Sequence, residues 1–67
     1  MATQLGGLRI DAYFFGIERI NDCYIAFVEK DKAKKCVKLE TVSVETFAQA
    51  EEKLTELVQK YQPYFDD

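Results

Sequence analysis

The hydrophobic pattern divides the chain into an apolar first half and a second half with helical spacing. Bulky apolar side chains occupy odd and even positions alike from Leu8 to Val28, and they alternate with polar ones from Cys36 to Thr41. Further on they recur every three or four residues, at Val44, Phe47, Ala50, Leu54, Leu57 and Tyr61. A period of two is typical of strands and a spacing of three to four of helices, so the pattern predicts strands followed by one amphipathic helix.

Two turn-forming segments divide the first half into three predicted strands. Asn21 and Asp22 favour a turn because both side chains can hydrogen-bond their own backbone, and residues 31–34 form a charged turn. The predicted strands are residues 8–17, 23–30 and 35–42, preceded by a flexible lead-in of residues 1–7. This arrangement predicts an α+β fold in which a three-stranded antiparallel meander is packed on one face by a single C-terminal helix.

The helix is predicted over residues 43–62, with residues 63–67 as a tail of the same single domain. Ser43 can serve as N-cap, and Thr46 with Gln49 forms an alternative capping box a few residues later. Pro63 ends the helix because proline lacks the backbone N–H and restricts the residue before it. Tyr64 and Phe65 are expected to fold back on the core.

Strand register decides which apolar side chains face this helix. With even-length turns near residues 20–21 and 32–33, one face of the sheet gathers Tyr13, Phe15, Ile17, Tyr24, Ala26, Val28, Val37 and Leu39. The opposite face gathers Ile10, Ala12, Phe14, Cys23, Ile25, Phe27, Cys36, Lys38 and Glu40. The third strand places aliphatic residues on the first face and charges on the second, so the first face is predicted to lie under the helix.

One helix covers only one face of a small sheet, which leaves apolar side chains on the other. We therefore predict a partner-binding cluster of Ile10, Phe14, Ile25 and Phe27. Exposed apolar patches of this kind usually mark contact sites, and aromatic residues dominate the energetics of such contacts. The alternative is that the lead-in and the Tyr64–Phe65 tail wrap around and cover part of the cluster.

Length and composition indicate a small globular protein whose fold is only marginally stable by itself. A chain of 67 residues buries only about 60 % of its unfolded surface, and a second subunit is one common reinforcement. Cys23 and Cys36 are too far apart along the predicted hairpin to form a disulfide, so they are expected to be free thiols. No apolar run approaches the length of a membrane span, and a cytoplasmic protein is expected.

Charge is unevenly distributed around a net value of −3. Residues 29–38 carry a net charge of +3 and residues 39–67 a net charge of −5. The basic segment offers a candidate anion-binding site at Lys32, Lys34 and Lys35, although a solvated hairpin tip explains the same residues. In the order of its elements alone, the chain resembles the AP2-type and integrase arm-binding DNA modules, which read DNA with the sheet.

The sequence offers no candidate catalytic residue, metal ligand or cofactor. The chain has no histidine, its single serine is a candidate helix cap, and its two cysteines lack metal-site spacing. We therefore predict a non-catalytic protein-interaction module, a homodimer or the binder of another protein, that acts as a regulator or inhibitor. Small acidic inhibitors of host defence encoded by phages are similar in size and charge. The alternative is a nucleic-acid-binding module that uses the sheet and the lysine-rich hairpin.

Overall fold

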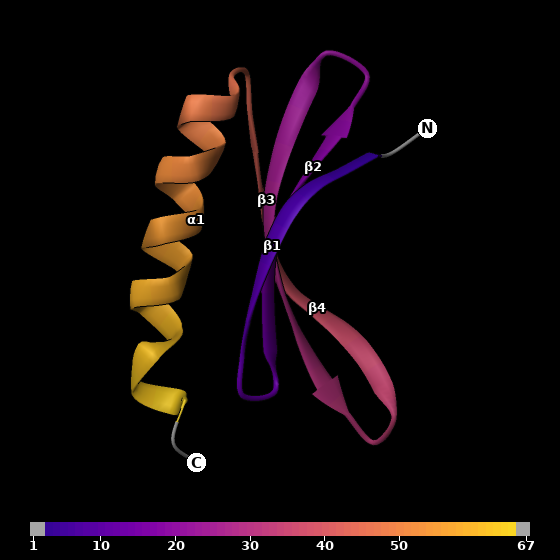
Figure 1. Cartoon of the computed structure of the whole chain (residues 1–67), viewed down its shortest axis with the longest axis vertical. Coiled ribbons are helices and arrows are strands. Elements are labelled where there is room, and N and C mark those ends of the chain that lie inside the picture. The colour runs from indigo at the N-terminus through magenta and orange to yellow at the C-terminus, as the bar shows by residue number, and fades with distance from the viewer. Residues whose placement is uncertain (1–2, 66–67) are drawn as a thin grey trace.

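The computed structural model describes residues 3–65 and contains a four-stranded antiparallel sheet with one helix against it (Figure 1). The strands lie side by side in chain order: β1 (Thr3–Ile10), β2 (Tyr13–Ile20), β3 (Cys23–Lys32) and β4 (Lys35–Val44). Helix α1 (Phe47–Tyr61) and a short 3-10 turn, η1 (Gln62–Tyr64), follow. The α+β class, the antiparallel sheet and the single C-terminal helix are confirmed, and the predicted number of three strands is wrong.

The strand missing from the prediction is β1. Residues 3–7, predicted as a flexible lead-in, form most of this strand, while residues 1–2 and 66–67 lie outside the described residues. The chain then reverses at a two-residue turn, Asp11–Ala12, with Asp11 in the left-handed region at a φ of 53°. Asp is one of the few residues that adopt this conformation readily. What was predicted as one strand over residues 8–17 is therefore the end of β1, a turn and the start of β2.

Helix α1 begins where the capping box predicts. The hydroxyl of Thr46 accepts a hydrogen bond from the backbone N–H of Gln49 at 3.2 Å. The side chain of Gln49 in turn accepts one from the N–H of Thr46 at 3.2 Å. Ser43, the other predicted cap, lies in β4 and pairs with Ile25 of β3. The helix therefore starts four residues later than predicted, at Phe47, and ends at Tyr61.

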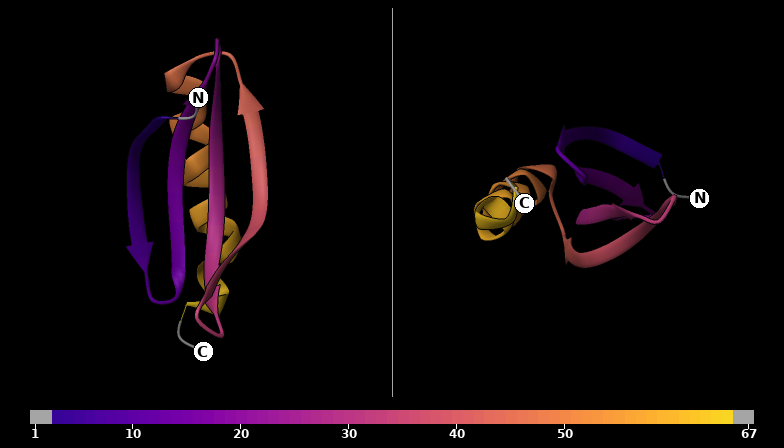
Figure 2. Two further views of the ribbon diagram at one scale, coloured as in Figure 1. Left: turned by 90° about the vertical axis from the view of Figure 1, so that its right-hand side faces the viewer. Right: turned by 90° about the horizontal axis from the view of Figure 1, so that it is seen from below.

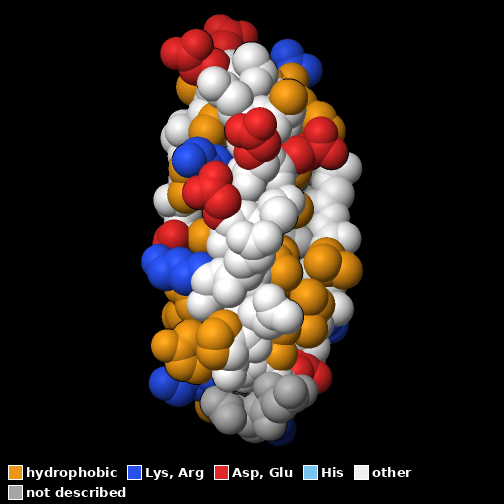
Figure 3. Space-filling view, turned by 90° about the vertical axis from the view of Figure 1, so that its left-hand side faces the viewer, with side chains coloured by type: hydrophobic (Ala, Val, Ile, Leu, Met, Phe, Trp, Pro, Cys, Tyr) orange, Lys and Arg blue, Asp and Glu red, His pale blue; other side chains and the backbone are white. Residues whose placement is uncertain are grey.

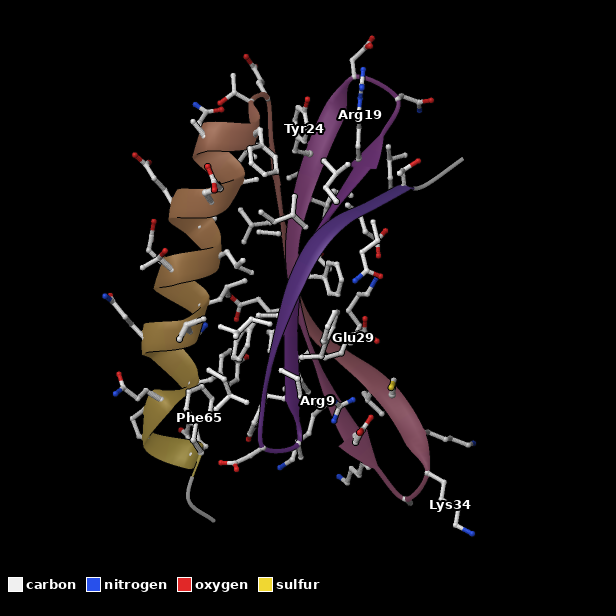
Figure 4. All side chains as sticks on the ribbon, viewed as in Figure 1. Arg9, Arg19, Tyr24, Glu29, Lys34 and Phe65 are labelled. Atoms are coloured by element: carbon white, nitrogen blue, oxygen red, sulfur yellow. The ribbon has the colours of Figure 1, made fainter. Side chains whose placement is uncertain are left out.

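The main core lies between α1 and one face of the sheet, here called the helix-side face. Phe15 pairs with Val28 and Ile17 with Ala26, so the face predicted for these side chains is confirmed. The buried cluster under the helix consists of Tyr13, Phe15, Ala26, Val28 and Leu57. Phe65 folds back against this cluster as predicted, with its ring centroid 5.6 Å from that of Tyr13 (Figure 4).

A β-bulge in β4 changes which side chains face the helix. Val28 pairs with Glu40 and Glu29 with Lys38, which leaves Leu39 without a partner on β3. Glu40 therefore lies on the helix-side face, and its predicted place on the opposite face is wrong. Val37 and Leu39, predicted as core, are 43 % and 41 % exposed because they lie where the hairpin separates from the helix.

The bulge also bends the sheet, since an extra residue increases the local twist of a strand. Seen from the end, the sheet curls so that its outer strands, β1 and β4, bend away from α1 (Figure 2). The β3–β4 hairpin swings away from the C-terminal end of the helix (Figure 1). This divergence leaves space between the hairpin and the helix end, while the face turned away from α1, here called the open face, becomes concave.

Candidate functional site

The predicted partner-binding cluster is divided between the two faces of the sheet. Three of its four members lie on the open face, as predicted: Phe14, Ile25 and Phe27. The strand register places them there, since Phe14 pairs with Glu29, Ile25 with Ser43 and Phe27 with Gly16. Ile10 pairs with Tyr13 and packs against the core cluster, so its predicted place on the open face is wrong. The reason is the Asp11–Ala12 turn, which puts Ile10 and Phe14 on different strands.

Phe27 has almost no exposed surface, although α1 covers the opposite face. Its side chain is 1 % exposed, and Phe14 and Ile25 are partly buried. The rings of Phe14 and Phe27 pack with their centroids 6.0 Å apart. The open face therefore holds a small aromatic core of its own, and Phe27 is unavailable for contact with a partner.

Two paired glycines make room for these rings. Gly7 of β1 lies directly opposite Gly16 of β2. A methyl group added at Gly16 would stand 2.6 Å from Cζ of Phe27, and one added at Gly7 would overlap Cζ of Phe14. The rings thus occupy the positions that side chains of residues 7 and 16 would otherwise fill, which lets them lie down on the backbone.

Two ion pairs cross the concave open face. Nζ of Lys38, on β4, lies 3.9 Å from a carboxylate oxygen of Glu18, on β2, and 4.8 Å from the ring centroid of Phe27 on the strand between them. Arg9 of β1 donates a hydrogen bond of 2.8 Å to Asp31 of β3. Both pairs join strands that are not neighbours, which the curl of the sheet allows. Both lie beside the aromatic rings, since Lys38 stands over Phe27 and Arg9 is paired with Phe14 in the register of β1 and β2.

The Arg9–Asp31 pair also holds a cysteine. Sγ of Cys36 donates a hydrogen bond of 2.9 Å to the other carboxylate oxygen of Asp31. The guanidinium of Arg9 and this thiol lower the pKa of Asp31, and the bond to Asp31 raises the pKa of the Cys36 thiol. Cys23 and Cys36 are both free and exposed. A raised pKa leaves less of the reactive thiolate at neutral pH.

The three lysines of the alternative anion site surround the tip of the β3–β4 hairpin. Lys32, the last residue of β3, pairs with Lys35, the first residue of β4, and Lys34 lies in the turn between them. All three are exposed, and Lys34 points away from the body of the protein (Figure 4). The turn residues Ala33 and Lys34 both have positive φ, 51° and 68°, which ordinary L-residues adopt only at a cost.

A groove of about 470 Å³ opens where this hairpin diverges from the helix end. Its volume lies within the range of small-ligand and side-chain pockets. Five different elements contribute to its lining, which consists of Tyr13, Lys30, Lys32, Val37, Leu39, Lys60, Tyr61 and Tyr64. Seen from the helix side, apolar and basic side chains gather together at this end of the β4 flank (Figure 3).

Charges in the groove are arranged in a neutral neck and a basic rim. At the neck, Glu40 accepts hydrogen bonds from Nζ of Lys60 at 2.6 Å and from the hydroxyl of Tyr61 at 3.3 Å. Burial and the charge of Glu40 raise the pKa of Tyr61, so its hydroxyl remains protonated at neutral pH. At the rim, Nζ of Lys30 lies 5.1 Å above the ring of Tyr13. Neither Lys30 nor Lys32 forms an ion pair within residues 3–65.

Sequence reasoning identified Lys32 but missed the groove as a whole. Its lining residues come from segments that begin at Tyr13 and end at Tyr64, and only the fold brings them together. The one local signal is the pair of exposed aliphatic residues, Val37 and Leu39, which alternate with lysines near the hairpin tip. That alternation is equally typical of a strand with one buried face, which is how it was interpreted.

Other site chemistry is not visible in the part of the chain that the structure describes. Residues 3–65 contain no group of three or more acidic, cysteine or histidine side chains placed to hold a metal ion. No helix among them is long and apolar enough to cross a membrane. Comparisons with protein families, with curated proteins and with solved structures found no match for this chain.

Proposed function

We propose that this protein is a non-catalytic protein-interaction module that binds an acidic segment of a partner in the groove between the β3–β4 hairpin and α1. The observation that carries the proposal is the combination of exposed apolar surface and unpaired lysines at one site. Val37, Leu39 and Tyr64 are 43 %, 41 % and 53 % exposed there, beside Lys30 and Lys32. A module of this kind acts as a regulator or inhibitor by covering a surface of its partner.

The lining of the groove specifies the chemistry of the bound segment. The aliphatic side chains of Val37 and Leu39 and the rings of Tyr61 and Tyr64 suit a bulky apolar side chain. Carboxylates on either side of that side chain would meet the ammonium groups of Lys30 and Lys32. Because the chain as a whole carries a net charge of −3, these lysines also favour approach of an acidic segment in one orientation.

The groove replaces the open face as the proposed contact surface. Phe27 is buried and the ion pairs of Lys38 and Arg9 cross the open face, so little apolar area there remains for a partner. The groove by contrast keeps its apolar side chains accessible. Of the three lysines that line the groove, Lys60 is already paired with Glu40. Lys30 and Lys32 are left to bind the carboxylates of a partner.

The proposal is tested by titrating the full chain with the blocked peptide Glu-Glu-Phe-Glu-Glu and its glutamine counterpart, following tyrosine fluorescence. We expect the acidic peptide to bind more tightly than the neutral one. Tyr64→Ala should weaken binding by about tenfold and Lys32→Glu by roughly three- to tenfold. Lys34→Glu makes the same charge change two residues away, outside the groove lining, and should leave binding nearly unchanged. Equal effects of the two lysine substitutions would refute the groove as the site.

Nucleic-acid binding is the second candidate function, and the hairpin tip favours it. Lys32, Lys34 and Lys35 are all exposed and extend the basic rim of the groove, where Tyr64 offers a ring for base stacking. This function requires Lys34 and Lys35 as well as Lys32. In a titration with single-stranded oligothymidylate at low salt, Lys34→Glu should therefore weaken binding as strongly as Lys32→Glu. The affinity should also fall steeply with added salt.

A further inference from the structure

The two edge strands of the sheet are protected to different degrees. The β4 edge carries Lys35, Lys38 and Glu40 and is interrupted by the bulge at Leu39. Edge strands in natural proteins are commonly protected by such lysines and bulges. Strand β1 is irregular as well, between Gln4 and Gly6, but it pairs regularly with β2 from Gly6 to Ile10. Between Thr3 and Ile10 it carries a single charged residue, Arg9, against three on β4, and the guanidinium of Arg9 pairs with Asp31. The β1 edge thus offers unpaired backbone groups with little electrostatic protection.

Apolar side chains accompany this free edge. Helix α1 packs on β2, β3 and β4, and its backbone does not come close to that of β1. Leu8, which shares the helix-side face with Phe15, is consequently 47 % exposed, and Leu5 is 43 % exposed. Apolar side chains gather along this flank of the helix as well as along the β4 flank (Figure 3). An added strand would cover Leu8 and complete the hydrogen bonding of β1 at the same time.

We propose that a second copy of this chain supplies the added strand, by antiparallel pairing of β1 with β1 of its partner about a two-fold axis. Such an interface is self-complementary, because each strand presents the same N–H and C=O groups to the other, and these groups alternate regularly from Gly6 to Ile10. Antiparallel pairing places Arg9 of one copy beside the uncharged Thr3 and Gln4 of the other, so the two guanidinium groups stay apart.

The dimer joins the two sheets into one of eight strands. Rotation about an axis perpendicular to the sheet keeps both α1 helices on the same face. The two copies of Leu8 then lie between the helices, where they lose the exposure they have in the single chain. The two grooves remain free, because each lies on the β4 flank, at the far edge from β1. This inference does not depend on what the groove binds.

Backbone geometry provides a selective test. The two-residue turn makes Ile10 and Tyr13 a hydrogen-bonded pair. Because bonded and non-bonded pairs alternate along an antiparallel ladder, the next bonded pair is Leu8 with Phe15. The N–H of Arg9, which lies between them, therefore points away from β2 toward the free edge. Arg9→Pro removes that outward donor, while Arg9→Ala removes the same side chain and the ion pair but keeps the donor. In sedimentation velocity between 5 and roughly 500 µM, we expect the unmodified chain and Arg9→Ala to dimerise and Arg9→Pro to remain monomeric.

A wild-type chain that stays monomeric over this range would overturn the proposal, as would equal dimerisation of Arg9→Pro and Arg9→Ala. Circular dichroism of each variant shows whether it is folded. If Arg9→Pro fails to fold, Leu8→Lys and Leu39→Lys form a second pair, since the two leucines are similarly exposed on opposite edges of the sheet. Leu8→Lys should abolish the dimer and Leu39→Lys should preserve it. The reverse result would place the interface on β4 and refute the assignment to β1.

Discussion

Replacing Gly16 by alanine should destabilise the protein, although alanine is normally preferred over glycine in a strand. The added methyl group would stand 2.6 Å from Cζ of Phe27, well inside van der Waals contact, and 3.1 Å from a ring carbon of Phe14. Phe27 cannot easily move aside because it is 1 % exposed and packs against Phe14 and Lys38. The clash must therefore be relieved by displacement of a ring or of the backbone.

The expected loss follows from two opposing terms. Glycine in a strand is less favourable than alanine by roughly 0.5–1 kcal/mol, which by itself would make the substitution stabilising. Forcing an extra methyl group into a packed core costs about 1–3 kcal/mol. The net loss in the free energy of unfolding therefore lies between about 0 and 2.5 kcal/mol, with a central value of about 1 kcal/mol, and each kcal/mol lowers the Tm of so small a domain by roughly 4–8 °C.

Urea unfolding followed by circular dichroism measures this loss, and Gly6→Ala provides the matched control. A methyl group at Gly6 meets no atom within 4 Å, so that variant should be as stable as the wild type or more stable by up to about 1 kcal/mol. Phe27→Leu makes room at Gly16, so Gly16→Ala should cost much less in that background. If Gly16→Ala and Gly6→Ala have the same stability, Phe27 does not lie on Gly16 and the reasoning is wrong.

Three further substitutions test local features of the fold. Thr46→Ala removes the hydroxyl that accepts the hydrogen bond from the first turn of α1, and should lower the free energy of urea unfolding by about 1 kcal/mol. Lys34→Gly places glycine at a φ of 68° and should raise the same free energy by about 1 kcal/mol. Arg9 and the thiol of Cys36 lower the pKa of Asp31, so its carboxylate stabilises the folded state above its ordinary pKa of 3.8 and stops doing so as the pH falls. Asp31→Asn should therefore weaken the acid dependence of Tm, and it should speed alkylation of Cys36 by iodoacetamide because the largest cause of the raised thiol pKa is removed. An unchanged alkylation rate would contradict the Cys36–Asp31 hydrogen bond.

The helix and the facing of the central strands were predictable because their signals are local and periodic. The spacing of apolar residues from Phe47 to Tyr61 gave the helix, and the Thr46–Gln49 capping box marked its start. The even length of the turn predicted near residues 20–21 gave β2 and β3 the correct relative facing, although the observed turn, Asn21–Asp22, lies one residue further on. Serine at position 43 was a misleading cap signal, because long-range pairing with Ile25 keeps that residue in β4.

Strand β1 escaped prediction because its signals are weak and its turn is unusual. Gly6 and Gly7 are typical of loops, and the pairing of glycine with glycine across β1 and β2 has no signature in a single sequence. The Asp11–Ala12 turn lacks the glycine that normally marks a two-residue hairpin. Without β1, no segment of the chain is seen to cover Phe14 and Phe27. For this reason the sequence predicted a partner-binding cluster on this face.

The groove was unpredictable for a different reason. It depends on the single unpaired residue at Leu39, which reverses the facing of Glu40 and bends the hairpin away from α1. A bulge of this kind is decided by packing between distant segments and not by the alternation of Val37, Lys38 and Leu39 itself. Lysines at the hairpin tip were visible in the sequence, but their relation to Tyr61 and Tyr64 was not.

Aromatic rings of this chain lie on paired glycines, an arrangement that covers the middle of the open face of its own sheet. The Hα resonances of Gly7, Gly16 and Gly6 in a proton–carbon correlation spectrum test it most directly, because a ring lying over a proton shifts its resonance upfield. We expect strong upfield shifts for Gly16 and Gly7, an ordinary position for Gly6, and no change on dilution. Ordinary positions for all three glycines, or shifts that vanish on dilution, would show that the rings do not lie there in the single chain.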